Sequence, residues 1–153
     1  MEKIICFCKG KALKIIIAII IILIIAAMAF TSLNGRTVVD FRILAESEIP
    51  QSITSQVIPQ YRNMERALAC VVDDKIYVIA TRGEKPSTGY DINIARMELQ
   101  ENEEESVLIV YADFRDPEPG LTLAQDLTYP LQVAETDLTA LPDRIELKVQ
   151  YAE

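Results

Sequence analysis

The longest hydrophobic segment lies near the amino end, where residues 15–33 contain no charged side chain. Isoleucine fills nine of the eleven positions from 15 to 25, so the segment lacks the polar face of an amphipathic helix. As a helix it would extend about 28 Å, close to the hydrocarbon thickness of about 30 Å. The pattern predicts one N-terminal transmembrane helix over residues 15–33.

All four lysines of the first 33 residues precede this segment, at positions 3, 9, 11 and 14. The positive-inside rule therefore predicts that residues 1–14 are cytoplasmic and that residues 34–153 form an extracytoplasmic domain of a single-pass cell-membrane protein. The alternative is a cleaved signal peptide, because Ala27, Met28 and Ala29 resemble a cleavage site, and cleavage near Ala29 would release a secreted protein. We favour a signal anchor because the apolar run exceeds the usual signal-peptide core of about 7 to 15 residues.

Beyond residue 33 the hydrophobic pattern changes to short segments. Residues 37–44 place Val39, Phe41 and Ile43 on one side, which predicts a strand with one buried face. Residues 48–59 carry a proline near their start and apolar residues at helical spacing. They predict a short helix that covers one end of a sheet and is limited or kinked by Pro59.

The rest of the chain reads as β-strands separated by turns. Asp73 and Asp74 separate two strands of one predicted hairpin, and the charged residues 100–105 form the tip of a second. About seven short strands predict a mainly β domain, either a small β-sandwich or a barrel, with a short helix. The later predicted strands are residues 67–72, 75–80, 90–99, 106–114, 131–134 and 145–151.

The predicted β domain is strongly acidic. Residues 34–153 hold 11 of the 15 basic residues and 22 of the 23 acidic ones, which gives a net charge of −11. A field of this sign disfavours nucleic acid and anionic lipid head groups as partners. The acidic hairpin tip is expected to be a solvated loop; calcium binding is the alternative, although the tip lacks the central glycine and alternating oxygen ligands of a dedicated calcium loop.

Residues for common kinds of catalysis are missing from the sequence. The chain has no histidine, which removes the usual general base of hydrolases and a frequent metal ligand. Carboxylate pairs such as Asp113 and Asp116 are expected by chance among so many acids, and Cys70 is expected to pack as a small apolar side chain. The sequence therefore predicts a protein that is not an enzyme and uses no metal or cofactor.

Two loops combine a restricted backbone with small or aromatic side chains, a composition suited to binding a partner protein at low ordering cost. In the first, EKPSTGYDI at residues 84–92, we expect Gly89 to adopt a positive φ and Ser87 and Thr88 to lie on an exposed tip. The alternative is that Tyr90 and Tyr129 only pack in the core with hydrogen-bonded hydroxyls. The candidate partner-binding residues are Lys85, Pro86, Ser87, Thr88, Gly89, Tyr90, Pro119 and Gly120.

Four motifs occur in a characteristic order: YVIA at 77–80, GEKPSTGY at 83–90, Pro119-Gly120, and QDLTYP at 125–130. Over approximately residues 75–151 this order resembles the C-terminal domain of the PrcB family of protease-complex subunits. Members are exported bacterial proteins, typically membrane-attached, and the namesake stabilises an extracellular subtilisin-like protease complex. The resemblance implies a non-catalytic accessory subunit that binds another protein, such as an extracytoplasmic protease. It also marks four residues as a structural motif: Gln125, Thr128, Tyr129 and Pro130.

The first loop departs from the usual family pattern of proline, threonine, two glycines and tyrosine. Ser87 and Thr88 replace the threonine and the first glycine, and Leu121 stands where an aspartate often follows Pro119-Gly120. The same loop also resembles the asparagine-proline-threonine-threonine-glycine-tyrosine loop of chagasin-like cysteine protease inhibitors, which are immunoglobulin-like sandwiches. The alternative function is therefore protease inhibition through residues 85–90, which would need several loops to converge on one edge of the domain.

Overall fold

The computed structural model describes residues 19–22, 35–102 and 104–151. The chain divides into a unit of residues 1–35 and a β domain of residues 36–153. Residues 19–22 are helical, but the rest of the predicted transmembrane helix, the predicted cytoplasmic segment 1–14 and the cleavage site near Ala29 lie outside the described residues. Within the described residues, no helix is long and apolar enough to cross a membrane.

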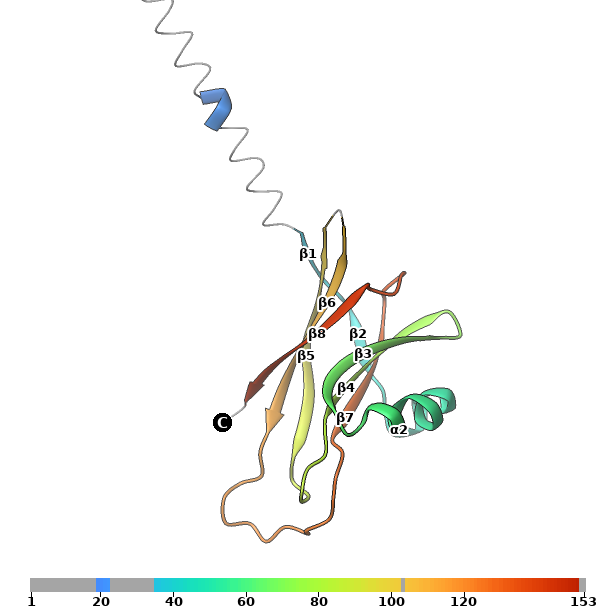
Figure 1. Ribbon diagram of the computed structural model, residues 1–153, viewed down its shortest axis with the longest axis vertical. Helices are drawn as coiled ribbons and strands as arrows, with labels where there is room; N and C mark the ends of the chain where they lie inside the picture. The colour runs from blue at the N-terminus through green and yellow to red at the C-terminus, as the bar shows by residue number, and fades with distance from the viewer. Residues whose placement is uncertain (1–18, 23–34, 103, 152–153) are drawn as a thin grey trace, which may run out of the picture. The chain divides into compact units, whose positions relative to one another are not determined.

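The β domain is a sandwich of two four-stranded sheets (Figure 1). Sheet A has the strand order β1-β5-β6-β8 and sheet B the order β2-β7-β4-β3. Neighbouring strands are antiparallel, except that β8 runs parallel to β6. The strands are β1 (Arg36–Val38), β2 (Phe41–Ile43), β3 (Glu65–Val72), β4 (Lys75–Arg82), β5 (Asp91–Glu101), β6 (Ser106–Arg115), β7 (Leu131–Thr136) and β8 (Arg144–Tyr151).

The main hydrophobic core fills the space between the sheets. Ile92 and Ile94 of sheet A pack in the same cluster as Val78 and Ala80 of sheet B, and Phe114 is fully buried there. On the opposite face of β4, Tyr77 and Ile79 belong to a second buried cluster. Because β4 is buried on both faces, its sequence is a continuous apolar run rather than an alternating one.

The single strand predicted over residues 37–44 is wrong, because the chain changes sheets within it. β1 pairs with β5 in sheet A, whereas β2 pairs with β7 in sheet B. At the crossing, the N–H of Val39 donates to the carbonyl of Met97 at 3.1 Å, and the carbonyl of Asp40 accepts from Asp137 at 3.1 Å. These two bonds fasten the crossing segment to both sheets, which the alternation of apolar residues does not reveal.

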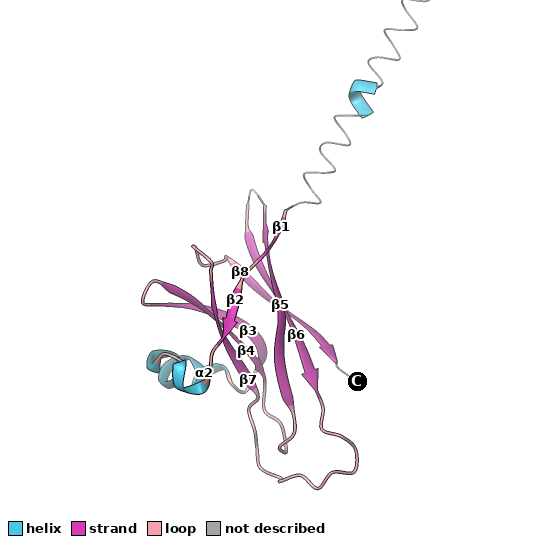
Figure 2. Ribbon diagram, turned by 180° about the vertical axis from the view of Figure 1, so that it is seen from behind, coloured by secondary structure: helices cyan, strands magenta, loops and turns pink. Residues whose placement is uncertain are grey.

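The predicted short helix is present as three consecutive pieces, η1 (Glu46–Glu48), the π-helical turn η2 (Ile53–Val57) and α2 (Ile58–Tyr61). Its fully buried Ile53 packs in the second cluster, so the helix covers the outer face of sheet B and not the end of a sheet (Figures 1 and 2). Pro59 lies in the first turn of α2 and does not end the helix. The turn before Pro59 is a π-turn, in which the N–H of Ile58 donates to the carbonyl of Ile53, five residues earlier. Pro59 has no N–H, so it does not compete for the carbonyls of this turn.

Both predicted hairpins are confirmed. β3 and β4 are joined by Asp73 and Asp74, whose φ angles of 50° and 60° are those of a tight turn matched to the strand twist. β5 and β6 form the second hairpin, and its tip is closed by a 3.0 Å hydrogen bond from the N–H of Asn102 to the carbonyl of Glu105.

The loops of the domain are divided between two ends. β1 and the tip of the β5–β6 hairpin lie at one end, and the loops formed by residues 83–90 and 116–130 lie at the other (Figure 1). β5, of 11 residues, runs from one end to the other, and at about 3.3 Å per residue it spans roughly 35 Å. The two candidate loops are therefore neighbours at the end of the domain remote from Arg36.

Candidate protein-binding site

The loop of residues 83–90, between β4 and β5, is hydrogen-bonded to the loop of residues 116–130, between β6 and β7. Lys85 and Thr128 exchange two backbone bonds, with N···O distances of 2.9 and 3.0 Å. The Thr128 hydroxyl donates to the carbonyl of Ser87 at 2.8 Å, and the N–H of Thr88 donates to the carbonyl of Ala124 at 3.1 Å. We call these two segments the loop pair, because their backbones form one connected unit.

Gly89 lies where the second loop packs closely against the first. Its φ of +93° confirms the expected positive value, which residues with a β-carbon rarely adopt. A β-carbon on Gly89 would lie 2.9 Å from the Cβ of Pro117 and 3.3 Å from a methyl carbon of Leu123. Gly120 has a similar φ of +89°, but a β-carbon there would meet none of the described residues within 4 Å.

The expectation that Ser87 and Thr88 lie on an exposed tip is wrong. Both residues are half-buried, because the second loop covers this part of the first and bonds to its backbone. Pro86 and Gly89 are exposed, while Lys85 and Tyr90 are half-buried.

Arg82, the last residue of β4, anchors the loop pair through its buried side chain. It is only 2% exposed, and its guanidinium donates to the carbonyls of Asp91 at 3.0 Å and Arg115 at 2.6 Å. It also forms an ion pair with Asp116. Asp91 follows the first loop and Asp116 opens the second, so one buried side chain holds the bases of both loops.

Aromatic rings enclose the same guanidinium. Its central carbon lies 5.0 Å from the ring centroid of Tyr90 and 4.7 Å from that of Phe114. The Nε atom of Arg82 is buried without a hydrogen-bond partner in the part of the chain that the structure describes. Sequence reasoning missed Arg82, although the alternation of β4 contained a signal: Ile76, Val78 and Ala80 point inward, and Arg82 continues that series.

The residues that the family resemblance marked as a structural motif lie mainly at the contact between the loops. The hydroxyl of Tyr129 donates to Glu84 at 2.9 Å, and this hydrogen bond raises the pKa of Tyr129. The guanidinium of Arg62, just after α2, lies 4.4 Å from the centroid of the Tyr129 ring. The carbonyl of Pro130 accepts from the N–H of Arg82 at 2.9 Å, whereas Gln125 is exposed.

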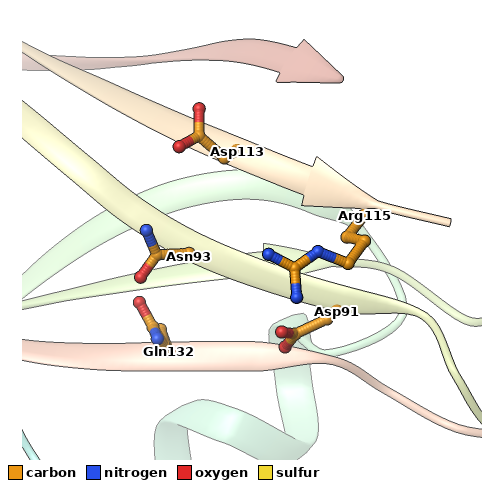
Figure 3. A pocket seen from close by; sticks show the side chains of 5 residues that line it. All are labelled: Asp91, Asn93, Asp113, Arg115 and Gln132. Atoms are coloured by element: carbon orange, nitrogen blue, oxygen red, sulfur yellow. The ribbon is translucent and has the colours of Figure 1, made fainter. Parts of the chain in front are cut away.

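A polar hollow of about 240 Å³ begins beside the bases of the loop pair (Figure 3). β5 contributes Asp91 and Asn93, which lie opposite Arg115 and Asp113 of β6, and Gln132 projects from β7. The Gln132 side-chain oxygen accepts from the N–H of Ile94 at 2.7 Å and so connects the two sheets. The alternation of β5 predicts that the side chains of Asp91 and Asn93 point outward. The position of Gln132 beside them depends on the tertiary fold.

The outer surface of the loop pair is partly apolar. Leu121 is 57% exposed and Leu127 is 61% exposed, and Pro86 and Pro119 are also exposed. Among the described residues, no cluster of three or more acidic or cysteine side chains is arranged to hold a metal ion. This surface therefore combines a hydrogen-bonded loop backbone with exposed apolar side chains.

The comparison with known protein families concerns this same part of the chain. Residues 76–137 match the family model described as PrcB C-terminal. The predicted resemblance is confirmed over that range, which ends before the predicted limit at residue 151 and includes every candidate site residue from Lys85 to Pro130. No curated protein and no solved structure matches the chain.

Proposed function

We propose that the β domain is a protein-binding module and that the loop pair is its contact surface, in a non-catalytic accessory or stabilising subunit of a protease or cell-envelope complex. The observation that carries the proposal is the joining of both loops into one rigid unit, anchored by Arg82, within the PrcB C-terminal match. A surface that is already ordered loses little entropy on binding. The exposed Leu121 and Leu127 are the apolar residues that a partner would cover.

The charge around these leucines indicates the character of the partner. Glu84, Glu118 and Asp126 of the loop pair are exposed and form no ion pair with any residue that the structure describes. A partner with an apolar centre and a basic rim would complement this surface, and the acidic field would speed their encounter.

The proposal is tested by affinity capture from membranes with the full-length protein as bait. Changing Leu121 and Leu127 together to glutamate removes the exposed apolar contact without removing a hydrogen bond. The control changes two other exposed apolar residues, Val71 (53%) and Leu141 (50%), to glutamate. We expect the partner to be captured by the original protein and by the control, and lost from the loop variant. Equal capture by a folded loop variant would contradict the proposed site.

We also propose that the protein is anchored in the cell membrane by residues 15–33, with residues 1–14 cytoplasmic and the β domain extracytoplasmic. The support is the uncharged run with lysines on one side only. Full-length protein should remain with membranes after high-salt washing, and external protease should digest its C-terminal domain in intact cells. A soluble mature form beginning at Phe30 would instead establish the secreted alternative.

A non-catalytic role is part of the same proposal. The chain has no histidine, so serine or cysteine chemistry would need an unusual base. Purified protein should not hydrolyse peptide or ester substrates. Turnover that is lost when one carboxylate or hydroxyl is replaced would show an enzyme.

Inhibition of a cysteine protease is the second candidate function, and one observation favours it. The loops of residues 83–90 and 116–130 converge on one end of the sandwich, as an inhibitor that enters a cleft requires (Figure 1). Titration of papain-like proteases with the full-length protein separates the two functions. Inhibition that is lost in the Leu121 and Leu127 variant supports an inhibitor, and unchanged protease activity supports the accessory role.

A further inference from the structure

Two long edge strands of the sandwich have no hydrogen-bonded neighbour on their outer side among the described residues, although their edges lie near each other. β8 ends sheet A and β3 ends sheet B, and each has eight residues, whereas β1 and β2 at the opposite edges have three. An edge strand presents a row of unpaired N–H and C=O groups to which another chain can add. The short edges at β1 and β2 offer little for such pairing.

The sequence of β8 is complementary to itself when it is read in the opposite direction. Ile145, Leu147 and Val149 pack against the core, so the alternate residues Glu146 and Lys148 lie on the outer face of sheet A. In an antiparallel pair of β8 strands centred on Leu147, Glu146 of each copy lies opposite Lys148 of the other. The two-fold symmetry produces this ion pair twice, as an isologous interface requires.

The surroundings of β8 agree with this register. Lys148 has no acidic partner within the described part of its own chain; its ammonium lies 5.7 Å from the ring centroid of Tyr111. Among the residues that the structure describes, Glu146 is paired only with Arg144 of the same strand, at 3.1 Å. A groove of about 420 Å³ lies between the two long edge strands; it is lined by Ile145 and Leu147 of β8, by residues 65–67 of β3 and by Met64 just before β3.

The edge of β3 lacks such complementarity. Its two charged residues, Glu65 and Arg66, are both at one end of the strand. Antiparallel self-pairing about the middle of β3 would set them opposite Val72 and Val71, so their charges would be unpaired.

We propose that a second copy of this chain pairs with β8 through its own β8, in antiparallel register about Leu147, to join the two A sheets into one continuous sheet. The two-fold axis is perpendicular to the sheet, so the ends of the two β domains that carry Arg36 point in opposite directions along the strands. The loop pairs point away from each other and stay free. An interface of one strand per chain buries less than about 1,200 Å², which is the size of a weak, transient interface. The fraction of dimer should therefore rise with protein concentration.

Sedimentation equilibrium of the full-length protein in detergent tests the register by charge exchange. Glu146→Lys and Lys148→Glu each place two like-charged pairs in the interface, and each should weaken dimerisation about tenfold or more. The double variant, with both changes, restores opposite charges and should return the dimerisation constant to near its original value. Glu101→Lys, at an exposed glutamate on β5, raises the net charge as much as Glu146→Lys does and should have no effect.

Disulfide trapping in detergent tests the same register independently. In a background with Cys6, Cys8 and Cys70 changed to serine, chains carrying Glu146→Cys are mixed with chains carrying Lys148→Cys. Residues directly opposite in antiparallel strands are about 4.5–5.5 Å apart at Cα, which suits a disulfide. The mixture should therefore cross-link more than either chain alone. A monomer at all concentrations, a dimer insensitive to both charge changes, or equal cross-linking in all three samples would overturn the proposal.

Discussion

Replacing Gly89 by alanine, with Gly120→Ala as its matched control, measures how tightly the two loops are joined. Both glycines have nearly the same φ, +93° and +89°, so an alanine at either position meets the same backbone strain of about 1 kcal/mol. Only at Gly89 does the new β-carbon also meet another residue, with Pro117 at 2.9 Å and Leu123 at 3.3 Å. The difference between the two variants isolates that contact.

The expected magnitudes follow from these two contributions. Gly120→Ala should lower the free energy of unfolding by about 1 kcal/mol. Gly89→Ala should lower it by about 2–4 kcal/mol, since forcing a methyl group into a packed contact adds about 1–3 kcal/mol. In a domain of this size the melting temperatures should fall by about 4 °C and about 8–16 °C.

Thermal melting and urea unfolding of the full-length protein in mild detergent, followed by circular dichroism, provide the measurement. The control must fold with the same spectrum as the original protein. If both variants lose the same stability, the second loop does not rest on Gly89, and the idea of one rigid loop pair is refuted.

Three further outcomes are expected. Arg82→Met should lower the free energy of unfolding by about 3 kcal/mol in urea titrations, because it leaves the carbonyls of Asp91 and Arg115 unpaired. Asp116→Asn changes a mostly exposed partner of Arg82 and should lower the free energy of unfolding by less than about 1 kcal/mol. Equal losses in the two variants would contradict the anchoring role of Arg82. A hydrogen bond from Lys75 holds the pKa of Glu135 below its usual value, so its stabilisation is present above the unfolded pKa of about 4.3 and is lost as the pH falls further. The melting-temperature deficit of Glu135→Gln at pH 7 should therefore disappear in acid; a constant deficit would exclude this linkage. Burial raises the pKa of Cys70, so iodoacetamide at pH 7.5 should label it slowly until urea unfolds the domain; rapid labelling of folded protein would show a reactive thiol.

The candidate site was predictable in its position along the chain but not in its construction. The proline and glycine of residues 84–92 predicted a shaped loop with a positive φ at Gly89, because those restrictions belong to single residues. The half-buried state of Ser87 and Thr88 was not predictable, since it comes from hydrogen bonds to a segment about 40 residues later. Arg82 was missed for the same reason: its partners follow from the ends of β5 and β6, which only the folded sandwich brings together.

The mainly β character of the domain, both hairpins and the presence of a short helix could be predicted from the sequence alone. These features depend on alternation, turn residues and helical spacing within about 20 residues, so local preferences are sufficient. Three further features became visible only in the fold: residues 37–44 divide between two sheets, the helix covers the outer face of β4, and the two loops are hydrogen-bonded to each other. Each of these depends on which distant strands become neighbours and in what register, and that choice is made by burying the apolar faces of the whole domain at once.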